Sequence, residues 1–288
     1  MFPRKAESTK AVAVWTLRLI LLLVCLAGLA AAQVPTPAPS PHAAFMQRPG
    51  GRAAGYLPEE EVPDFLRILP PVPLAESQED EADVALLRWW QRPENSPRWQ
   101  LAKADADVSY RRFSAAFGSD IDAVKAPLLV HLLDRVEADV SAPLGQAKDF
   151  YHRPRPYQRL AMEHVCGFAS APVPDPTSKP GNSYPSGHTS FGWTAALVLG
   201  EVTPDHAQTI LARAREYGES RLVCAVHFPS DVQGGELLAT AVFARVRVQP
   251  EYRRDLRCAQ EEHAVVLGTK MQLSPACLAM SQRLAKQP

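Results

Sequence analysis

The stretch Tyr184-Pro185-Ser186-Gly187-His188-Thr189 lies directly before residues 191–199, a strongly apolar segment that predicts a central helix. A turn that leads into a helix places Ser186 and Gly187 at the helix N-terminus, where free backbone N–H groups favour an anion. The serine hydroxyl adds a donor, and the glycine lets the backbone approach a ligand closely. We therefore expect an anion site here, with His188 beside the anion.

A second block lies upstream, in Lys148-Asp149-Phe150-Tyr151-His152-Arg153-Pro154-Arg155-Pro156. The prolines predict that a helix carrying Lys148 ends near residue 152, and that Arg155 sits on a stiff extended segment. Arginine offers a planar fork for phosphate oxygens and lysine offers a point charge. The alternative reading is two unrelated surface cations, but prolines on both sides of Arg155 favour a fixed position.

A third block lies downstream, from Ser220 to Asp231, and supplies Arg221, His227 and Asp231. Pro229-Ser230 predicts the start of a helix with Asp231 in its first turn. A carboxylate there can accept a hydrogen bond from a histidine on the preceding loop, which fixes the tautomer and leaves the other ring nitrogen free to attack. Histidine is a competent nucleophile in covalent catalysis.

In their order and internal spacing, the three blocks resemble the signature of the type 2 phosphatidic acid phosphatase superfamily, which also includes the vanadium haloperoxidases. The resemblance extends over residues 65–265. Three further stretches are similar to the secreted bacterial class A non-specific acid phosphatases: Gly181-Asn182-Ser183-Tyr184, Ile68-Leu69-Pro70-Pro71 and Ala104-Asp105-Ala106. The resemblance implies an all-α fold, no metal, no cofactor and small-molecule phosphate monoesters as substrates.

The resemblance also implies a role for each matching residue. His227 corresponds to the nucleophile that forms a phosphohistidine, Asp231 to its orienting partner and His188 to the general acid. The phosphate-binding residues are then Lys148, Arg155, Ser186, Gly187 and Arg221. Three cations and several N–H groups would neutralise charge on the oxygens of a five-coordinate phosphorus.

The two histidines need opposite protonation states, which predicts a bell-shaped pH profile. Because a bound anion raises histidine pKa values, we expect an acidic optimum. Tyr184 and Phe150 are candidates to line the leaving-group pocket. The alternatives are a vanadate-dependent haloperoxidase, whose relatives are longer, a membrane lipid phosphatase, whose relatives carry several spanning helices, and a phosphate binder without turnover.

The rest of the chain predicts an all-α, single helical-bundle domain without strands. Apolar residues recur every three to four positions across 99–117 and 128–140, and helices are also predicted at 207–217, 232–246 and 251–265. Gly234 and Gly235 would permit close packing of the 232–246 helix. The tryptophans are interpreted as core residues rather than a binding surface: Trp89, Trp90, Trp99 and Trp193.

The N-terminus has the pattern of a secretion signal. Basic residues precede an apolar run at 17–29, and Ala30-Ala31-Ala32 offers a small-residue cleavage site. An uncleaved anchor is the alternative, although the run is shorter than the ~20 residues that span a bilayer. We therefore predict a signal peptide at 1–32, a Pro/Ala-rich flexible lead-in at 33–59, an all-α domain at 60–280, and a periplasmic or secreted protein.

Composition limits the partners. The formal charge is zero, so nothing suggests nucleic-acid binding, and we expect no membrane association after signal cleavage. The resemblance implies a homo-oligomer, most simply a dimer. Behind the signal, four cysteines remain, which predicts two disulfides or, alternatively, free buried thiols. Of the possible connectivities we favour Cys166–Cys224 with Cys258–Cys277, because the first pair would join loops that flank the site.

Overall fold

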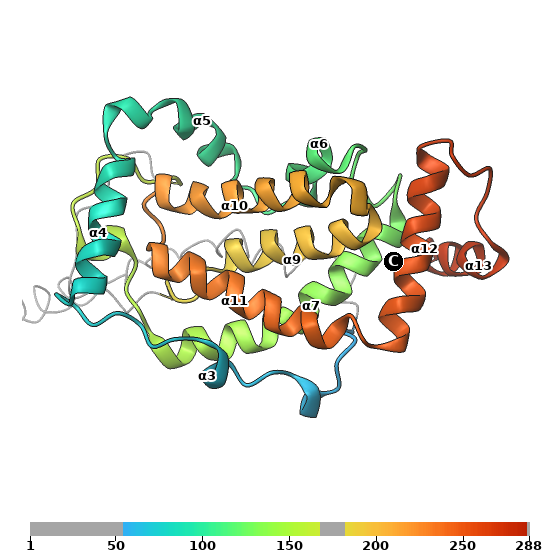
Figure 1. The fold of residues 1–288 in the computed structure, drawn as a ribbon, viewed down its shortest axis with the longest axis horizontal. Helices are drawn as coiled ribbons and strands as arrows, with labels where there is room; N and C mark the ends of the chain where they lie inside the picture. The colour runs from blue at the N-terminus through green and yellow to red at the C-terminus, as the bar shows by residue number, and fades with distance from the viewer. Residues whose placement is uncertain (1–53, 168–181, 287–288) are drawn as a thin grey trace, which may run out of the picture. The chain divides into compact units, whose positions relative to one another are not determined.

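The computed structural model describes residues 54–167 and 182–286, which belong to one compact unit of the chain. Within these ranges every regular element is helical and no strand occurs, so the all-α prediction is confirmed (Figure 1). The α-helices are α3 Phe65–Ile68, α4 Gln78–Trp90, α5 Pro97–Ala104, α6 Ser114–Phe117, α7 Pro127–Tyr151, α8 Pro156–Arg159, α9 Gly187–Val202, α10 Ala207–Val223, α11 Pro229–Val246, α12 Pro250–Val266 and α13 Pro275–Leu284. Short 3₁₀ turns lie at Glu59–Glu61, Pro93–Asn95, Tyr110–Phe113 and Pro204–His206.

The apolar helix predicted at 191–199 is the centre of the domain. It forms most of α9, which packs against α7, α10 and α11 (Figure 1). Phe191, Ala196 and Leu199 are fully buried there. A helix that is apolar on all sides has to be enclosed by other helices, which is why the sequence places α9 inside.

Helix α11 approaches α9 closely at Gly235. A Cβ on this glycine would lie 2.6 Å from the carbonyl oxygen of Ser186, so a side chain cannot be accommodated without a shift of the backbone. This contact confirms the close packing predicted for the 232–246 helix. It also brings the first turn of α11 beside the first turn of α9.

Helix α7 is the longest described helix, and its buried face contains the predicted Leu128–Val140 pattern. Its N-terminus is capped from α12, because the Glu262 carboxylate accepts hydrogen bonds from the amides of Leu128 and Leu129 at 3.0 and 2.9 Å. The helix ends at His152, which adopts a left-handed conformation with φ of 47°. The predicted end near residue 152 is therefore confirmed.

The predicted helical pattern over 99–117 is not one helix. It divides into α5, a 3₁₀ turn and α6, because residues 105–109 form a loop. The Asp105 carboxylate, fully buried in this loop, pairs with Arg213 and accepts a 2.7 Å hydrogen bond from the Ser220 hydroxyl. Satisfying a buried carboxylate in this way outweighs the propensity of the surrounding residues to continue the helix.

The packed domain begins earlier than the predicted boundary at residue 60. Tyr56 is 8% exposed, its amide donates to Asp139 at 2.8 Å and its hydroxyl donates to Asp255 at 3.0 Å. Residues 54–57 therefore contact α7 and α12. The predicted signal peptide and residues 33–53 of the predicted lead-in lie outside the described residues.

The prediction that all four tryptophans are core residues is only partly right. Trp89 is 40% exposed, whereas Trp90, Trp99 and Trp193 are half-buried against the apolar clusters. Within the described ranges, no helix combines the length and the apolar composition that a bilayer crossing requires.

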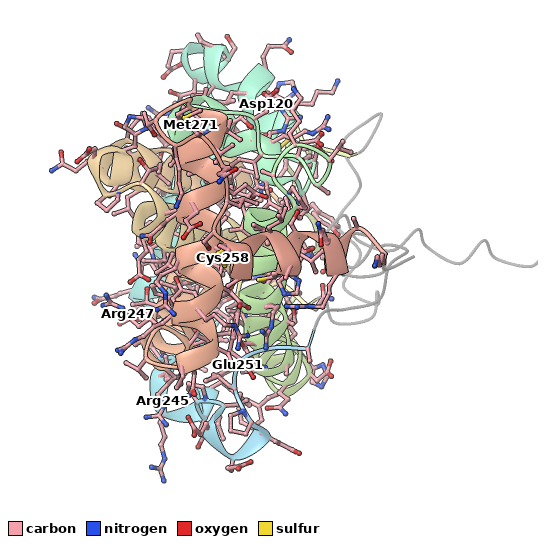
Figure 2. The ribbon with its side chains drawn as sticks, turned by 90° about the vertical axis from the view of Figure 1, so that its right-hand side faces the viewer. Asp120, Arg245, Arg247, Glu251, Cys258 and Met271 are labelled. Atoms are coloured by element: carbon pink, nitrogen blue, oxygen red, sulfur yellow. A yellow bond between two sulfur atoms is a disulfide. The ribbon has the colours of Figure 1, made fainter. Side chains whose placement is uncertain are left out.

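Two disulfides join segments that are distant in the sequence, and both match the connectivity that we favour. Cys258 of α12 is bonded to Cys277 of α13, and Figure 2 shows these two helices crossing at Cys258. Cys166, which follows α8, is bonded to Cys224 at the end of α10. The Cys258–Cys277 bond joins α13, the last described helix, to α12. The Cys166–Cys224 bond joins the segment after α8 to the end of α10, beside the candidate site.

Candidate active site

The three sequence blocks meet where α7 ends and α9 and α11 begin, on the left of Figure 1. The Ser186 amide donates to the Asp231 carbonyl at 2.9 Å and so joins the starts of α9 and α11. The Lys148 ammonium group, in the last turn of α7, donates to the carbonyls of Asn182 and Pro185 at 2.6 and 2.7 Å. Residues far apart in the sequence therefore share one site.

The imidazole of His227 lies between a carboxylate and a guanidinium. Its Nδ1 is 3.4 Å from Oδ2 of Asp231, and its Nε2 is 3.2 Å from Nη1 of Arg155. An ionised carboxylate only accepts hydrogen bonds and a guanidinium only donates them. The arrangement therefore assigns the ring proton to Nδ1 and leaves the lone pair of Nε2 directed toward Arg155.

Arg155 has the extended backbone that its flanking prolines predict, with φ of −74° and ψ of 157°. Besides His227, its guanidinium donates to the Val226 carbonyl at 3.1 Å and to Oδ1 of Asn182 at 3.3 Å. Its own amide donates to the Gln158 side chain at 2.7 Å. The prolines and these contacts together fix the guanidinium beside the histidine.

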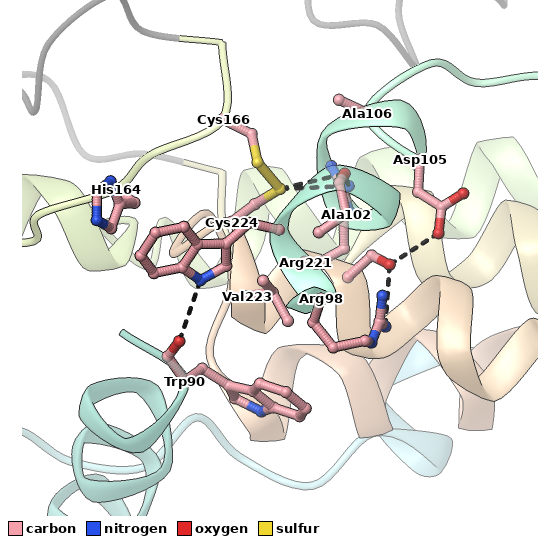
Figure 3. The surroundings of a disulfide bond; sticks show 12 residues. Trp90, Arg98, Ala102, Asp105, Ala106, His164, Cys166, Arg221, Val223 and Cys224 are labelled. Atoms are coloured by element: carbon pink, nitrogen blue, oxygen red, sulfur yellow. Dashed lines mark hydrogen bonds between the residues drawn. A yellow bond between two sulfur atoms is a disulfide. The ribbon is translucent and has the colours of Figure 1, made fainter. Parts of the chain in front are cut away.

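Arg221 reaches the site from the last turn of α10 and is 3% exposed. Its Nη2 donates to the Ala102 carbonyl at 2.9 Å and contacts Sγ of Cys224 at 3.6 Å (Figure 3). Its Nε atom is buried and has no hydrogen-bond partner among the described residues. The disulfide to Cys166 is therefore in direct contact with one of the candidate phosphate-binding residues.

Ser186 is the N-cap of α9, and Gly187 is the first residue of that helix, as predicted. The Ser186 hydroxyl oxygen accepts from the Thr189 amide at 3.3 Å and from the Thr189 hydroxyl at 3.0 Å. A hydroxyl that accepts two bonds still has one proton to donate. His188, in the first turn, is 8% exposed, and its Nε2 donates to the Ala106 carbonyl at 3.1 Å.

The electrostatics of the site come from crowded, buried cations. Burial and then repulsion from Arg155 lower the pKa of Lys148 to about 7. Burial is also the main reason that the pKa of Arg221 falls to about 10, with a smaller contribution from Arg155. Cations that destabilise one another inside a protein would be stabilised by a bound anion, because opposite charge favours the protonated state.

The protein groups also keep His227 neutral. Burial and then the charge of Arg155 lower the pKa of its imidazole to about 3, although Asp231 acts in the opposite direction. Burial alone would raise the pKa of Asp231, but the hydrogen bond from His227 and the charge of Arg153 hold it well below its usual value. The raised histidine pKa that we expect from a bound anion is thus not produced by the protein groups of the site.

Sequence reasoning did not single out two residues that touch Asp231. The Ser183 hydroxyl donates to Oδ2 of Asp231 at 2.6 Å, and the Arg153 guanidinium donates to Oδ1 at 2.7 Å. Ser183 directly precedes the Tyr184–Thr189 stretch, and Arg153 stands two positions before Arg155 in the same block. Their places beside these blocks were the signal that could have identified them.

The prediction for the leaving-group pocket is wrong for Tyr184. Its ring is fully buried, packs against Gly234 and donates from its hydroxyl to the Pro70 carbonyl at 2.8 Å. Phe150 is 59% exposed. In the part of the chain that the structure describes, no three or more His, Cys, Asp or Glu side chains gather as a group that could hold a metal ion.

The sequence of the chain is similar to those of known proteins, and these similarities identify its family. The model of the PAP2 superfamily matches residues 132–255, the range that contains all three blocks. An acid phosphatase of Zymomonas mobilis is 34% identical over 203 residues, which cover 69% of this chain and 75% of the relative. A non-specific acid phosphatase of Providencia stuartii is 35% identical over 214 residues, covering 73% of this chain and 84% of the relative.

A non-specific acid phosphatase of Salmonella typhimurium is 37% identical over 175 residues, covering 58% of this chain and 67% of the relative. The matches to the relatives, the helical fold and the convergence of the three blocks agree with one another. The chain therefore belongs to the PAP2 superfamily, as an acid phosphatase of the bacterial non-specific type.

Proposed function

We propose that the protein is a secreted, metal-independent phosphatase that hydrolyses small phosphate monoesters through a phosphohistidine on His227. The observation that carries this proposal is the position of the His227 ring between Asp231 and Arg155. The Nε2 lone pair is directed toward a guanidinium that would hold a phosphate oxygen. A neutral nucleophile beside a cation that binds its substrate is the arrangement that phosphoryl transfer requires.

In the first step, Nε2 of His227 attacks phosphorus while the bond to the ester oxygen breaks. His188 gives its proton to the leaving alkoxide, and Asp231 stabilises the charge that develops on the His227 ring. Arg155, Lys148 and Arg221 hold the phosphate oxygens in this proposal. Ser186 and the amides at the start of α9 add donors.

In the second step, water attacks the phosphohistidine and the P–N bond breaks. His188, now neutral, takes a proton from the water, and the products are inorganic phosphate and neutral His227. The enzyme returns to its starting state, so no metal or redox cofactor enters the balance of either step.

The proposed location is the periplasm or the medium. The predicted signal peptide at 1–32 supports it, and so do the two disulfides, which are typical of oxidising compartments. Mass spectrometry of the exported protein should find a chain that begins near Gln33. We also propose a homodimer, which light scattering on the purified protein would test.

The test of the chemistry is hydrolysis of p-nitrophenyl phosphate by the mature protein in EDTA, beside His227→Ala. We expect wild-type activity to survive the chelator and the variant to lose it by at least about 10³-fold, as when a nucleophile is removed. A quench in alkaline detergent with a ³²P-labelled substrate should trap alkali-stable, acid-labile label on the wild type alone. Activity that needs a metal, or persists in His227→Ala, would refute the proposal.

A further inference from the structure

Arg153 is a buried arginine that the proposed reaction does not use, and its side chain is 2% exposed. Its Nη1 donates to Oδ1 of Asp231 and to Oγ of Ser230, both at 2.7 Å. Its Nη2 donates to Oδ2 of Asp83 at 2.9 Å. One guanidinium therefore connects α4 to the carboxylate that faces His227.

The backbone of Arg153 reaches the same carboxylate by a second route. Its carbonyl accepts a 3.0 Å hydrogen bond from the Ser183 amide, and the Ser183 hydroxyl donates to Oδ2 of Asp231. Oδ1 is thus held by the Arg153 side chain, and Oδ2 by a residue attached to the Arg153 backbone. A carboxylate held on both oxygens cannot rotate away from the imidazole of His227.

Asp83 fixes Arg153 in turn. Its carboxylate accepts from the Ser230 amide at 3.0 Å and from the Ser230 hydroxyl, so it also caps the start of α11. The Arg153 guanidinium lies over the Phe228 ring, 4.1 Å from its centroid. Ionic, capping and ring contacts therefore allow one position for the guanidinium.

We propose that Arg153, held by Asp83, is a positioning residue that sets the orientation and the charge environment of His227 through Asp231. This inference rests on the proposed role of His227 as the nucleophile. Within the described ranges, the hydrogen bonds and ion pairs of the Arg153 side chain go to Asp231, Ser230, Asp83 and Asp80 and not to the His227 ring, so it acts through the carboxylate.

The charged groups that surround His227 and Arg153 determine how each residue affects the protonation of the His227 ring. His227 faces Asp231 of α11, Arg155 before α8 and Lys148 of α7. Arg153 faces Asp83 and Asp231, and also Asp80 of α4 at 3.7 Å, whose other partner is Arg159 of α8.

These charges predict opposite effects for two variants. Without the charge of Arg153, Asp231 stabilises the imidazolium more strongly, so His227 takes up a proton at higher pH. Without the charge of Asp83, Arg153 neutralises Asp231 more completely, so His227 takes up a proton only at lower pH. A residue with a merely structural role would not produce shifts of opposite sign.

The experiment measures kcat and the pH dependence of kcat/KM for Arg153→Met and Asp83→Asn in the mature protein, with p-nitrophenyl phosphate. We expect Arg153→Met to lower kcat by about 100-fold, the cost of misplacing a reacting group, and to move the acid limb to higher pH. Asp83→Asn should move the acid limb to lower pH. Arg153→Lys keeps the charge, so it should lower kcat without moving the limb upward.

Arg135→Met is the matched control, because Arg135 is an arginine with a 12% exposed side chain whose Nη1 lies 3.0 Å from Asp255, between α7 and α12. It should lower the melting temperature and leave the acid limb unchanged. If Arg153→Met does not fold, the downward shift of the acid limb in Asp83→Asn and the lower kcat without an upward shift in Arg153→Lys decide the matter. Acid limbs of Arg153→Met and Asp83→Asn that stay at the wild-type pH, or move in the same direction, would overturn the inference, as would an unshifted limb in Asp83→Asn where Arg153→Met does not fold.

His227→Ala is assayed alongside to separate this inference from the proposed function. An active His227→Ala would refute the proposed function and the inference that rests on it. An inactive His227→Ala with wild-type kcat and acid limb in the Arg153 and Asp83 variants would refute the positioning role alone.

Discussion

The Ser183 hydroxyl donates a 2.6 Å hydrogen bond to Oδ2 of Asp231, and both side chains are fully buried. The same hydroxyl is 3.4 Å from Nδ1 of His227. Ser183 therefore holds the carboxylate at the oxygen that faces the imidazole. A buried acceptor that loses a donor pays a desolvation cost, which links catalysis and stability at this residue.

Ser183→Ala should lower kcat by about 10-fold, the smaller end of the effect of removing a partner that orients a catalytic group. It should also lower the free energy of unfolding by about 1–3 kcal/mol. Steady-state kinetics and urea denaturation measure the two effects. Ser141→Ala is the control, because Ser141 lies inside α7 and its hydroxyl donates to the Glu137 carbonyl of the same helix at 2.8 Å. Equal kcat in both variants would contradict the prediction.

Lys148 should set the alkaline limb of the pH profile. Its pKa is lowered to about 7 by burial and Arg155, so the ammonium is charged below that pH and loses its charge above it. We expect kcat/KM to fall as pH rises through about 7, and to hold toward acid pH because His227 stays neutral there. Lys148→Arg keeps its charge at higher pH and should move the alkaline limb upward. An alkaline limb that stays in place in Lys148→Arg would contradict this prediction and point to His188 as the group that sets the limb.

The two disulfides should differ in their effects. Cys166–Cys224 closes 58 residues and Cys258–Cys277 closes 19. Chain entropy then predicts stability losses of about 4 and about 3 kcal/mol when each is replaced by serines. Because Arg221 contacts Cys224, only the first replacement should also raise KM. Thermal denaturation and kinetics on both double variants test this. A KM effect from the α12–α13 disulfide would show that the contact is not the cause.

Two glycines should respond to alanine in opposite ways. Gly235→Ala places a Cβ 2.6 Å from the Ser186 carbonyl oxygen, so α11 and α9 must separate at the site. We expect a loss of about 1–3 kcal/mol and lower activity. Gly145 lies inside α7, and an added Cβ would meet nothing within 4 Å. Gly145→Ala should stabilise the helix by about 1 kcal/mol with normal activity. Melting temperatures that change in the same direction would refute this interpretation.

Much of the candidate site could be predicted because its residues occur in three local blocks. The positions of Ser186 and Asp231 at the starts of helices follow from turn residues, proline and an apolar run, which are short-range signals. The end of α7 before Arg155 has the same origin, because proline restricts its own backbone and that of its neighbour. Such features depend on a few adjacent residues, so the sequence alone determines them.

The helical class of the fold was predictable for a related reason. Apolar residues spaced three to four apart in α7 indicate which of its faces is buried, whatever it packs against, and the uniformly apolar α9 has to lie inside the domain. The pattern failed across 99–117, because the carboxylate of Asp105 has partners on α10 that lie more than a hundred residues away. Periodicity does not encode such partners.

The sequence could not show which side chains form ion pairs or hydrogen bonds with one another. Asp83 is not part of any of the three blocks, yet it is 5% exposed and pairs with Arg153. Ser183 has no predicted role in the site, yet its hydroxyl donates to Asp231. The amino-acid sequence alone specifies the local backbone conformation and the types of side chain available for the site. The network around His227 arises only when α4, α7, α9 and α11 pack together, because hydrogen bonds and burial depend on distances that no local stretch specifies.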